Sequence, residues 1–240
     1  MGIIHIPRTI AASLRGAIKR RFSPLSDQEI SLVGTCDVPH IYSSRAGILD
    51  VDAMGHMNNA SYLQHAELAR WEWGAFGGSL AQSLKTQTFF LVTASMIRFR
   101  REIGPWQRFD IETRLVGLDN RNLWVYQTFH HHVDGSKTRD FTNGGNEDKM
   151  GKTGGKILAQ ILTQAVLAKS GKGVIDPRPW LEDNCIYSRE ILDEISNQKR
   201  HNEMDSIFDE KTKRFLHLED ILRSSAASYD EKVPKQRNDS

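Results

Sequence analysis

The chain has 240 residues, of which 39% are hydrophobic, and this length allows one well-buried domain with appendages. Its formal net charge of +2 excludes the basic excess that is typical of nucleic-acid-binding proteins, so we expect no nucleic acid among its partners. The two cysteines, Cys36 and Cys185, favour reduced thiols in an intracellular compartment over a disulfide framework.

The first 24 residues, MGIIHIPRTIAASLRGAIKRRFSP, contain five basic residues and no acidic one. An apolar helix face is available from Ile10, Leu14, Ala17 and Ile18. A cationic amphipathic segment is typical of a mitochondrial transit peptide and equally of a helix on an anionic membrane surface; a basic tail without an address is the third possibility. We expect residues 1–35 to be a targeting or membrane-surface segment. The first 24 of them should take no part in the fold, so deleting them should leave thermal stability nearly unchanged. The expected location is the mitochondrion, with the cytoplasm or a membrane surface as alternatives.

Residues 50–70, DVDAMGHMNNASYLQHAELAR, crowd turn-forming residues against the start of a helix. Capping needs one such residue, but five are present: Asp52, Gly55, His56, Asn58 and Asn59. The helix is indicated by apolar residues three and four positions apart, namely Tyr62, Ala66, Ala69 and Trp73, and it ends near Phe76 at a pair of glycines. A carboxylate on the incoming loop lies within reach of a carbonyl oxygen at the first helical turn, and this geometry suits acyl chemistry.

Extended segments precede and follow this helix. Residues 36–50 are rich in strand-forming side chains, and residues 86–102 and 108–119 alternate apolar and polar side chains with a period of two. A tight-turn signal at Asp119-Asn120 leads into a further alternating segment at 123–133, so these last two strands should form a hairpin. The pattern predicts a mainly antiparallel sheet.

The second half of the chain is less regular. Residues 134–155 are rich in Gly, Asn, Lys and Asp, which indicates a solvated insertion. Residues 156–170, KILAQILTQAVLAKS, have helical spacing, yet the sheet needs another strand to cover the helix, and the pattern alone favours helix. In the charged segment 181–240 we expect helices that begin at Ser188 and Asp209, and a disordered tail over the last ten residues.

Two possible ligand sites are rejected from their spacing. In GGNEDKMGKT, residues 144–153, five residues rather than four separate Gly145 from Gly151, so the phosphate-binding loop pattern is not met. The histidines at 130–132 alternate across a strand and have no Cys or carboxylate neighbour in sequence, so no metal site is predicted.

Three arginines, Arg98, Arg100 and Arg101, end one predicted strand. They are either a solvated rim or an anion clamp that holds the phosphates of a carrier such as coenzyme A through forked guanidinium contacts. Alternation along a strand places Arg98 and Arg100 on one face and Arg101 on the other, so the three cannot serve equally.

The order of these elements resembles the hotdog-fold thioesterases of the 4-hydroxybenzoyl-CoA thioesterase family, and in particular its eukaryotic thioesterase superfamily member-like branch. The resemblance rests on the Asp-x-x-Gly-His-x-Asn-Asn-x-x-Tyr turn with its helix, and on IRFRREIGPWQRFDIETRLVGLDNRNLWVYQTFHHHVDG; it covers roughly residues 40–135 and continues weakly through 156–177. It implies an α+β hotdog domain at 36–180, an antiparallel sheet wrapped around a long central helix; the helical C-terminal extension, which the capping residues predict, has no counterpart in the family. It also implies that residues 156–170 form a strand.

Residue roles follow from this resemblance. Asp52 matches the family's catalytic carboxylate, and Asn59 matches the residue whose backbone N–H polarises the thioester carbonyl. His56 and Asn58 match positions that shape the loop, and Tyr62 closes the motif; His56 is expected among the catalytic residues, and Asn58 and Tyr62 are expected to contact the substrate. Glu67, on the helix, is the second candidate for the carboxylate, and a surface pair with Arg70 is its alternative role.

The resemblance implies hydrolysis of an acyl-CoA or acyl-carrier thioester without metal or other cofactor. Asp52 would either attack the thioester carbon or take a proton from water, and the sequence does not choose between these routes. The alternative function is a non-catalytic hotdog protein that binds acyl groups or a partner. We also expect a homodimer or higher homo-oligomer, because a single sheet around one helix leaves strand edges unpaired. Peripheral membrane contact is expected through the N-terminal segment.

Overall fold

A computed structural model describes residues 5–35, 38–133, 155–184 and 186–197. The helices are α1 (His5–Arg21), α2 (Asp27–Leu32), α3 (Asn59–Gly77), α4 (Ser79–Thr86), α5 (Pro177–Asp183) and α6 (Arg189–Asn197), and a short 3-10 helix, η1, covers Ile48–Asp50. The strands are β1 (His40–Arg45), β2 (Thr88–Phe99), β3 (Arg108–Leu118), β4 (Asn122–His131), β5 (Ile157–Lys169) and β6 (Gly173–Ile175).

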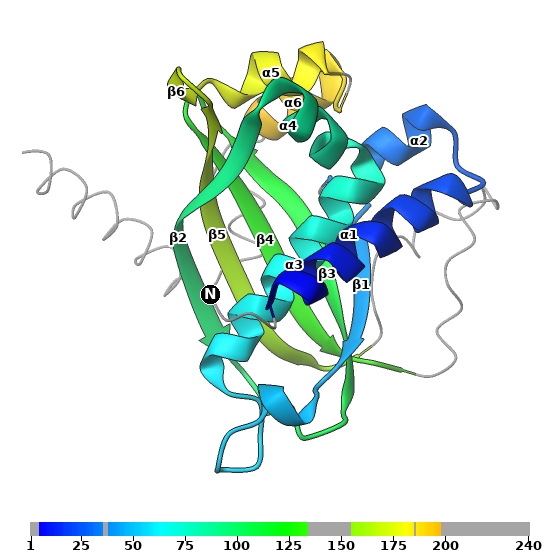
Figure 1. Ribbon diagram of the computed structural model, residues 1–240, viewed down its shortest axis with the longest axis vertical. Coiled ribbons are helices and arrows are strands. Elements are labelled where there is room, and N and C mark those ends of the chain that lie inside the picture. The colour runs from blue at the N-terminus through cyan, green and yellow to red at the C-terminus, as the bar shows by residue number, and fades with distance from the viewer. Residues whose placement is uncertain (1–4, 36–37, 134–154, 185, 198–240) are drawn as a thin grey trace, which may run out of the picture. The chain divides into compact units, whose positions relative to one another are not determined.

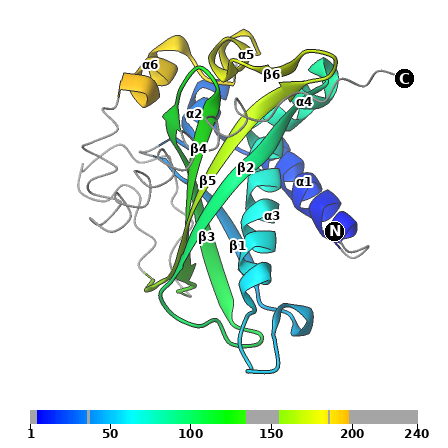
Figure 2. The same ribbon diagram turned by 90° about the vertical axis from the view of Figure 1, so that its left-hand side faces the viewer.

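The sheet has the strand order β1-β3-β4-β5-β2, with β6 paired to β5, and every pairing is antiparallel. Figures 1 and 2 show this sheet curving around α3, which runs along its concave face. The expected hotdog arrangement is confirmed. The predicted hairpin is β3 and β4, closed at Asp119 and Asn122 by a hydrogen bond of 3.0 Å from the Asp119 N–H to the Asn122 carbonyl.

The segment with conflicting signals, residues 156–170, is the strand β5. It pairs with β2 on one side and β4 on the other, and most of its residues are buried. A strand that is buried on both faces needs no polar alternation, because both of its faces select apolar side chains. Its apolar run therefore matched a helical period by coincidence, and the strand implied by the resemblance is confirmed.

A layer of polar side chains crosses the interior between α3 and the sheet. Thr113 on β3, Gln127 on β4 and Thr163 on β5 are fully buried. Gln127 Nε2 donates to the Ala66 carbonyl of α3 at 2.9 Å and to Thr113 Oγ1 at 3.1 Å, and Arg70 donates to Gln127 Oε1 at 2.6 Å. Burial lowers the pKa of Arg70 to about 10, so it stays protonated at neutral pH.

This polar layer separates two apolar clusters. The cluster nearer the start of α3 contains Tyr62, Phe109, Ile111, Phe129 and Ile161 among others, and the cluster nearer its end contains Leu115, Leu123, Val125, Leu167 and Trp180 among others. Along β3 the order Ile111, Thr113, Leu115 passes from one cluster through the layer to the other. The core is therefore built in two apolar parts with a hydrogen-bonded seam between them.

The N-terminal segment is part of this fold, which corrects the expectation that it stands apart. Helix α1 packs on the side of α3 that faces away from the sheet (Figures 1 and 2). The backbones approach closely at Gly16, where an added Cβ would overlap the Glu72 carbonyl oxygen and touch the Ala75 side chain. Only a residue without a side chain fits there.

Two cations of α1 contact a buried carboxylate of the domain. Glu72 of α3 is fully buried, and its carboxylate contacts Arg15 and, at 2.5 Å, the Lys19 Nζ. A buried carboxylate without a partner is strongly unfavourable, so these two cations bind α1 to α3. Removing the first 24 residues would leave Glu72 without them, and the expectation that such a deletion leaves thermal stability unchanged is therefore wrong.

The C-terminal part of the described chain is helical, as the capping residues predicted. Helix α6 follows Ser188 as predicted, and the Ser188 hydroxyl accepts from the Ile191 N–H at 3.5 Å. The predicted helix at Asp209 and the disordered tail lie outside the described residues, as does all of the predicted insertion except Gly155.

Candidate functional site

The Asp-x-x-Gly-His segment forms a tight turn just before α3. An isolated antiparallel bridge joins Val51 to Met57, and within it the Asp52 N–H donates to the His56 carbonyl at 3.0 Å. Gly55 has a φ of +83°, a left-handed conformation that glycine adopts at little cost, and its N–H donates to the Asp52 carbonyl at 3.1 Å. We call residues 52–56 the Asp52 turn.

The structure leaves the Asp52 carboxylate accessible. Its side chain is 37% exposed, and Oδ1 accepts a hydrogen bond from the Met54 N–H at 2.9 Å. His56 Nδ1 lies 3.9 Å from the same oxygen. Oδ2 takes part in neither contact. An accessible carboxylate held by one short backbone contact can act as a base or as a nucleophile.

Asn58 connects the Asp52 turn to the helix. Its side-chain oxygen accepts from the Ser61 N–H at 2.9 Å as the N-cap of α3, while its Nδ2 donates to the Asp50 carbonyl at 3.1 Å. Asn59 is the first helical residue. The N–H groups of the first helical turn have no acceptor within the helix. The Asn58 side chain accepts from the Ser61 N–H, and the N–H groups of Asn59 and Ala60 lie at the positive end of the helix dipole.

A second carboxylate, Asp50, was not singled out from the sequence and has the opposite surroundings. It is 3% exposed, and its side chain contacts Arg8 of α1 at 3.0 Å, His65 of α3 at 3.1 Å and the Gly47 N–H at 2.8 Å. Burial opposes ionisation of this carboxylate, but hydrogen bonds from His65 and the Gly47 N–H and the charge of Arg8 outweigh burial and hold its pKa well below the usual range. We call Asp50, Arg8 and His65 the Asp50 cluster.

The Asp50 cluster anchors the loop that carries the Asp52 turn. The Asp50 carbonyl accepts both from the Asn58 N–H at 2.9 Å and from its side chain, so it fixes the far end of the turn. His65 also lies 3.4 Å from the Ser44 hydroxyl of β1 and edge-on to the Phe109 ring. No local signal in the sequence pairs Arg8 with Asp50, because 42 residues separate them.

Glu67, the second candidate for the carboxylate, lies two helical turns into α3 and contacts α1. Its Oε2 is 3.1 Å from the His5 ring and its Oε1 accepts from the Trp71 indole at 3.3 Å. Arg70, its suggested surface partner, instead points into the polar layer of the core. The structure therefore does not bring Glu67 together with Asp52.

The segment after β2 lies against the Asp52 turn. The Met57 N–H donates to the Ile103 carbonyl at 2.8 Å, and the Tyr62 hydroxyl donates to the Arg101 carbonyl at 3.4 Å. The Tyr62 ring is buried against Phe99 and Phe129, and burial raises the pKa of its hydroxyl. Tyr62 thus positions the arginine segment, and its predicted substrate contact stays a prediction.

Of the three arginines that were expected to bind phosphate, Arg100 and Arg101 lie in the segment after β2, beside the Asp52 turn. Arg100 and Arg101 are exposed; the first donates to the Gln160 side chain at 3.0 Å and the second to the Ile157 carbonyl at 2.8 Å. Both backbone N–H groups donate to the Leu158 carbonyl, so the strand alternation breaks there. Arg98 stays on β2, opposite Gln160.

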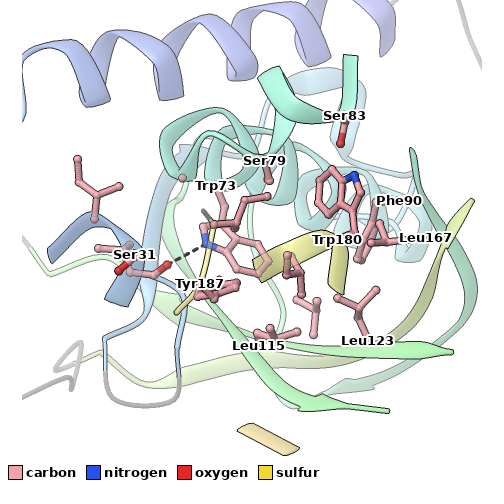
Figure 3. A pocket seen from close by; sticks show the side chains of 16 residues that line it. Ser31, Trp73, Ser79, Ser83, Phe90, Leu115, Leu123, Leu167, Trp180 and Tyr187 are labelled. Atoms are coloured by element: carbon pink, nitrogen blue, oxygen red, sulfur yellow. Dashed lines mark hydrogen bonds between the residues drawn. The ribbon is translucent and has the colours of Figure 1, made fainter. Parts of the chain in front are cut away.

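A cavity of about 80 Å³ lies near the other end of α3. Figure 3 shows the indole rings of Trp73 and Trp180 at its wall, with Leu115, Leu123 and Leu167 from the sheet. Trp73 is held by a hydrogen bond of 3.1 Å from its indole N–H to the Val33 carbonyl. At 1.5 Å per helical residue, Trp73 lies roughly 20 Å along the helix from Asn59, so the cavity is remote from the Asp52 turn.

Known proteins are similar to this chain in sequence and in fold. A family model, the thioesterase-like superfamily, matches residues 46–182, which contain the Asp52 turn, α3 and β2 to β6. Protein THEM6 of Danio rerio is 32% identical over 95 residues, 40% of this chain and 47% of that protein. Protein THEM6 of Drosophila melanogaster is 27% identical over 143 residues, 59% of this chain and 72% of that protein. The chain thus spans about half the length of the first of these relatives.

Solved structures with the same fold include the DHNA-CoA thioesterase from Staphylococcus aureus, with a TM-score of 0.50 and 16% identity over 69% of this chain and 94% of that chain. The probable thioesterase YbaW from Escherichia coli has a TM-score of 0.49 and 18% identity over 60% of this chain and 95% of that chain. At these identities the likeness shows the fold alone.

Proposed function

Because the chain belongs to the thioesterase-like superfamily, we propose that it hydrolyses an acyl-CoA or acyl-carrier thioester, with Asp52 as the reacting carboxylate. The observation that carries this proposal is the contrast within the matched region: Asp52 is the accessible carboxylate beside the start of α3, whereas Asp50 is buried and paired. Accessibility is what a carboxylate needs to reach a substrate carbonyl.

At the helix start, the N–H groups of the first turn and the Asp52 carboxylate would have different roles. The N–H groups of Asn59 and Ala60 would donate hydrogen bonds to the thioester carbonyl oxygen as it gains negative charge. Asp52 would then either attack the carbonyl carbon and release the thiolate, leaving an anhydride that water opens, or take a proton from a water that attacks the same carbon. Both routes consume one water and yield a carboxylic acid and a free thiol.

The test is thiol release from short, medium, long and aromatic acyl-CoAs by the full chain. We expect release from at least one of them, and a fall in turnover of roughly 100-fold or more for Asp52→Asn, the order expected on losing a base or nucleophile. The matched control is Asp183→Asn, an exposed aspartate at the end of α5, which should keep its activity.

Two outcomes would redirect the proposal. Full activity in Asp52→Asn would contradict the role of Asp52 and transfer it to Glu67, which Glu67→Gln would then test. If the wild type retains acyl-CoA in equilibrium dialysis but releases no thiol, the chain is the non-catalytic binding protein of the alternative hypothesis.

We also propose that the protein works as a homodimer that pairs through β2. This strand is at the end of the sheet order, so one row of its backbone N–H and C=O groups faces away from the sheet. It also exposes Phe89, Phe90, Leu91 and Val92. An exposed apolar edge strand is a template for pairing with a second copy. Light scattering at micromolar concentration should give twice 27.3 kDa, and a monomer would contradict the proposal.

A further inference from the structure

The outer face of α1 carries a ridge of large apolar side chains. Ile6, Ile10, Leu14, Ile18 and Phe22 follow one another at intervals of four residues, and their exposed fractions run from 55% to 81%. Pro7, Ala11 and Ala17 beside them are also exposed. Residues four apart are neighbours on a helix surface, and each step turns only about 40° further round the axis. These side chains therefore form one continuous strip that winds along α1 to Phe22 just after it, and we call it the α1 ridge.

The amphipathicity of α1 is the reverse of that of a surface helix that packs on a soluble core. Its core-facing side holds the small residues Ala12 and Gly16 and the paired cations, while its apolar side faces solvent. Helix α1 cannot detach from the domain at low cost, because two of its cations neutralise the buried Glu72. The domain therefore holds the α1 ridge outward in a fixed orientation.

The charge around the ridge indicates what covers it. Helix α1 contains no acidic residue, and the next acid in the chain is Asp27. At the end of the ridge Arg21 is exposed, and the Lys19 side chain is 43% exposed beside its contact with Glu72. An apolar strip on a helix without acidic residues, with Arg21 exposed at its end and the nearby Asp27 paired with Arg20, fits the boundary between acyl chains and anionic headgroups.

We propose that α1, docked on α3, attaches the domain to an anionic phospholipid membrane by inserting the α1 ridge into the headgroup region. This inference does not depend on the proposed hydrolase activity. The sequence predicted a cationic amphipathic helix on such a surface; in the structure four of its five cations, Arg8, Arg15, Lys19 and Arg20, contact the domain. Apolar insertion supplies most of the attachment, and Arg21 adds to it.

Among the described residues, no helix is both long and apolar enough to cross a membrane. The attachment inferred here is peripheral, in the plane of the interface, so it should be reversible and sensitive to single apolar side chains.

The test is co-sedimentation of the full chain with vesicles of phosphatidylcholine alone and of phosphatidylcholine mixed with phosphatidylglycerol. We expect the wild type to sediment with the mixed vesicles. In Ile10→Glu/Leu14→Glu, binding should fall at least tenfold for each side chain, the order expected when a leucine-sized group no longer leaves water. Arg21→Gln should weaken binding to the mixed vesicles about fivefold and leave binding to phosphatidylcholine alone unchanged.

The matched control is Leu84→Glu, a leucine of α4 that is 64% exposed and lies outside the ridge. It should bind vesicles as the wild type does, and all variants should keep the thermal midpoint of the wild type because the replaced side chains are exposed. The proposal is overturned if the wild type stays in the supernatant, or if the double variant binds as well as Leu84→Glu. If the wild type does not bind vesicles and the double variant has half the particle mass of the wild type in light scattering, a second copy of the chain covers the ridge and the proposal is overturned.

Discussion

Asp50 and Asp52 stand two positions apart, and the fold gives their carboxylates different surroundings. The Asp50 side chain is 4% exposed and contacts groups from α1, α3 and the Gly47 backbone, whereas that of Asp52 is 37% exposed and accepts from the Met54 N–H of its own turn. The difference teaches that one motif can give two carboxylates different surroundings: the buried one holds the loop, and the accessible one is the carboxylate that we propose for the chemistry.

The largest expected effect separates these tasks by stability. Asp50→Ala should lower the free energy of unfolding by about 3 kcal/mol, because it leaves His65 and the Gly47 N–H buried without their acceptor. Asp52→Ala should lower it by less than about 0.5 kcal/mol, as is usual for surface substitutions. Urea unfolding followed by circular dichroism measures both, and equal losses would contradict the division.

The comparison extends from carboxylates to arginines. Arg100 is exposed at the segment beside the Asp52 turn, so we expect Arg100→Ala to raise the KM for acyl-CoA with little change in kcat. A charge-assisted phosphate contact implies roughly a 10- to 150-fold rise at low salt, shrinking as salt screens the site. Steady-state kinetics at two ionic strengths check it. If both Arg100→Ala and Arg101→Ala leave KM unaltered at low salt, these arginines are only a solvated rim.

A smaller effect is expected at Arg8, the arginine of the Asp50 cluster. Its side chain is 29% exposed, so water replaces part of the lost contact in Arg8→Ala, and we expect a loss of about 1 kcal/mol in unfolding free energy with an unchanged KM. Arg100→Ala is the matched control and should show the reverse pattern. A raised KM in Arg8→Ala with unaltered stability would place Arg8 in substrate binding.

The smallest expected effect is the change in unfolding free energy with pH. The pKa of Asp50 is lower in the folded protein than its ordinary value of about 3.9, so its contribution to stability is present above about pH 4 and is lost as the pH falls toward the folded pKa. One such group changes the unfolding free energy by at most about 1.4 kcal/mol per pH unit. Unfolding curves of the wild type and Asp50→Asn should therefore converge below pH 4, and curves that stay parallel would exclude this linkage.

Local signals in the sequence predicted much of the framework. The helix after Asn58, the β3–β4 hairpin and the helix after Ser188 all follow from capping residues, turn residues and periodicity. The strand β5 did not, since burial along most of its length removes the alternation that marks a strand. Its assignment needed the family resemblance.

Contacts between distant residues were beyond the sequence pattern. The cationic face of α1 was visible in the sequence, but Glu72, which requires those cations, lies more than fifty residues away on a helix whose second buried face was not expected. For the same reason the motif offered two aspartates without indicating that Arg8 would bury one of them. The choice of Asp52 came from the resemblance, and the structure supplies a physical ground for it.

The polar layer of Thr113, Gln127, Thr163 and Arg70 has a consequence for how the domain opens. Because it separates two apolar clusters, the cluster nearer the end of α3, where α5 and α6 pack, can lose its packing while the seam keeps its hydrogen bonds. We therefore expect the two halves of the sheet to exchange amide hydrogens through separate opening events, with the half that carries the Asp52 turn exchanging more slowly.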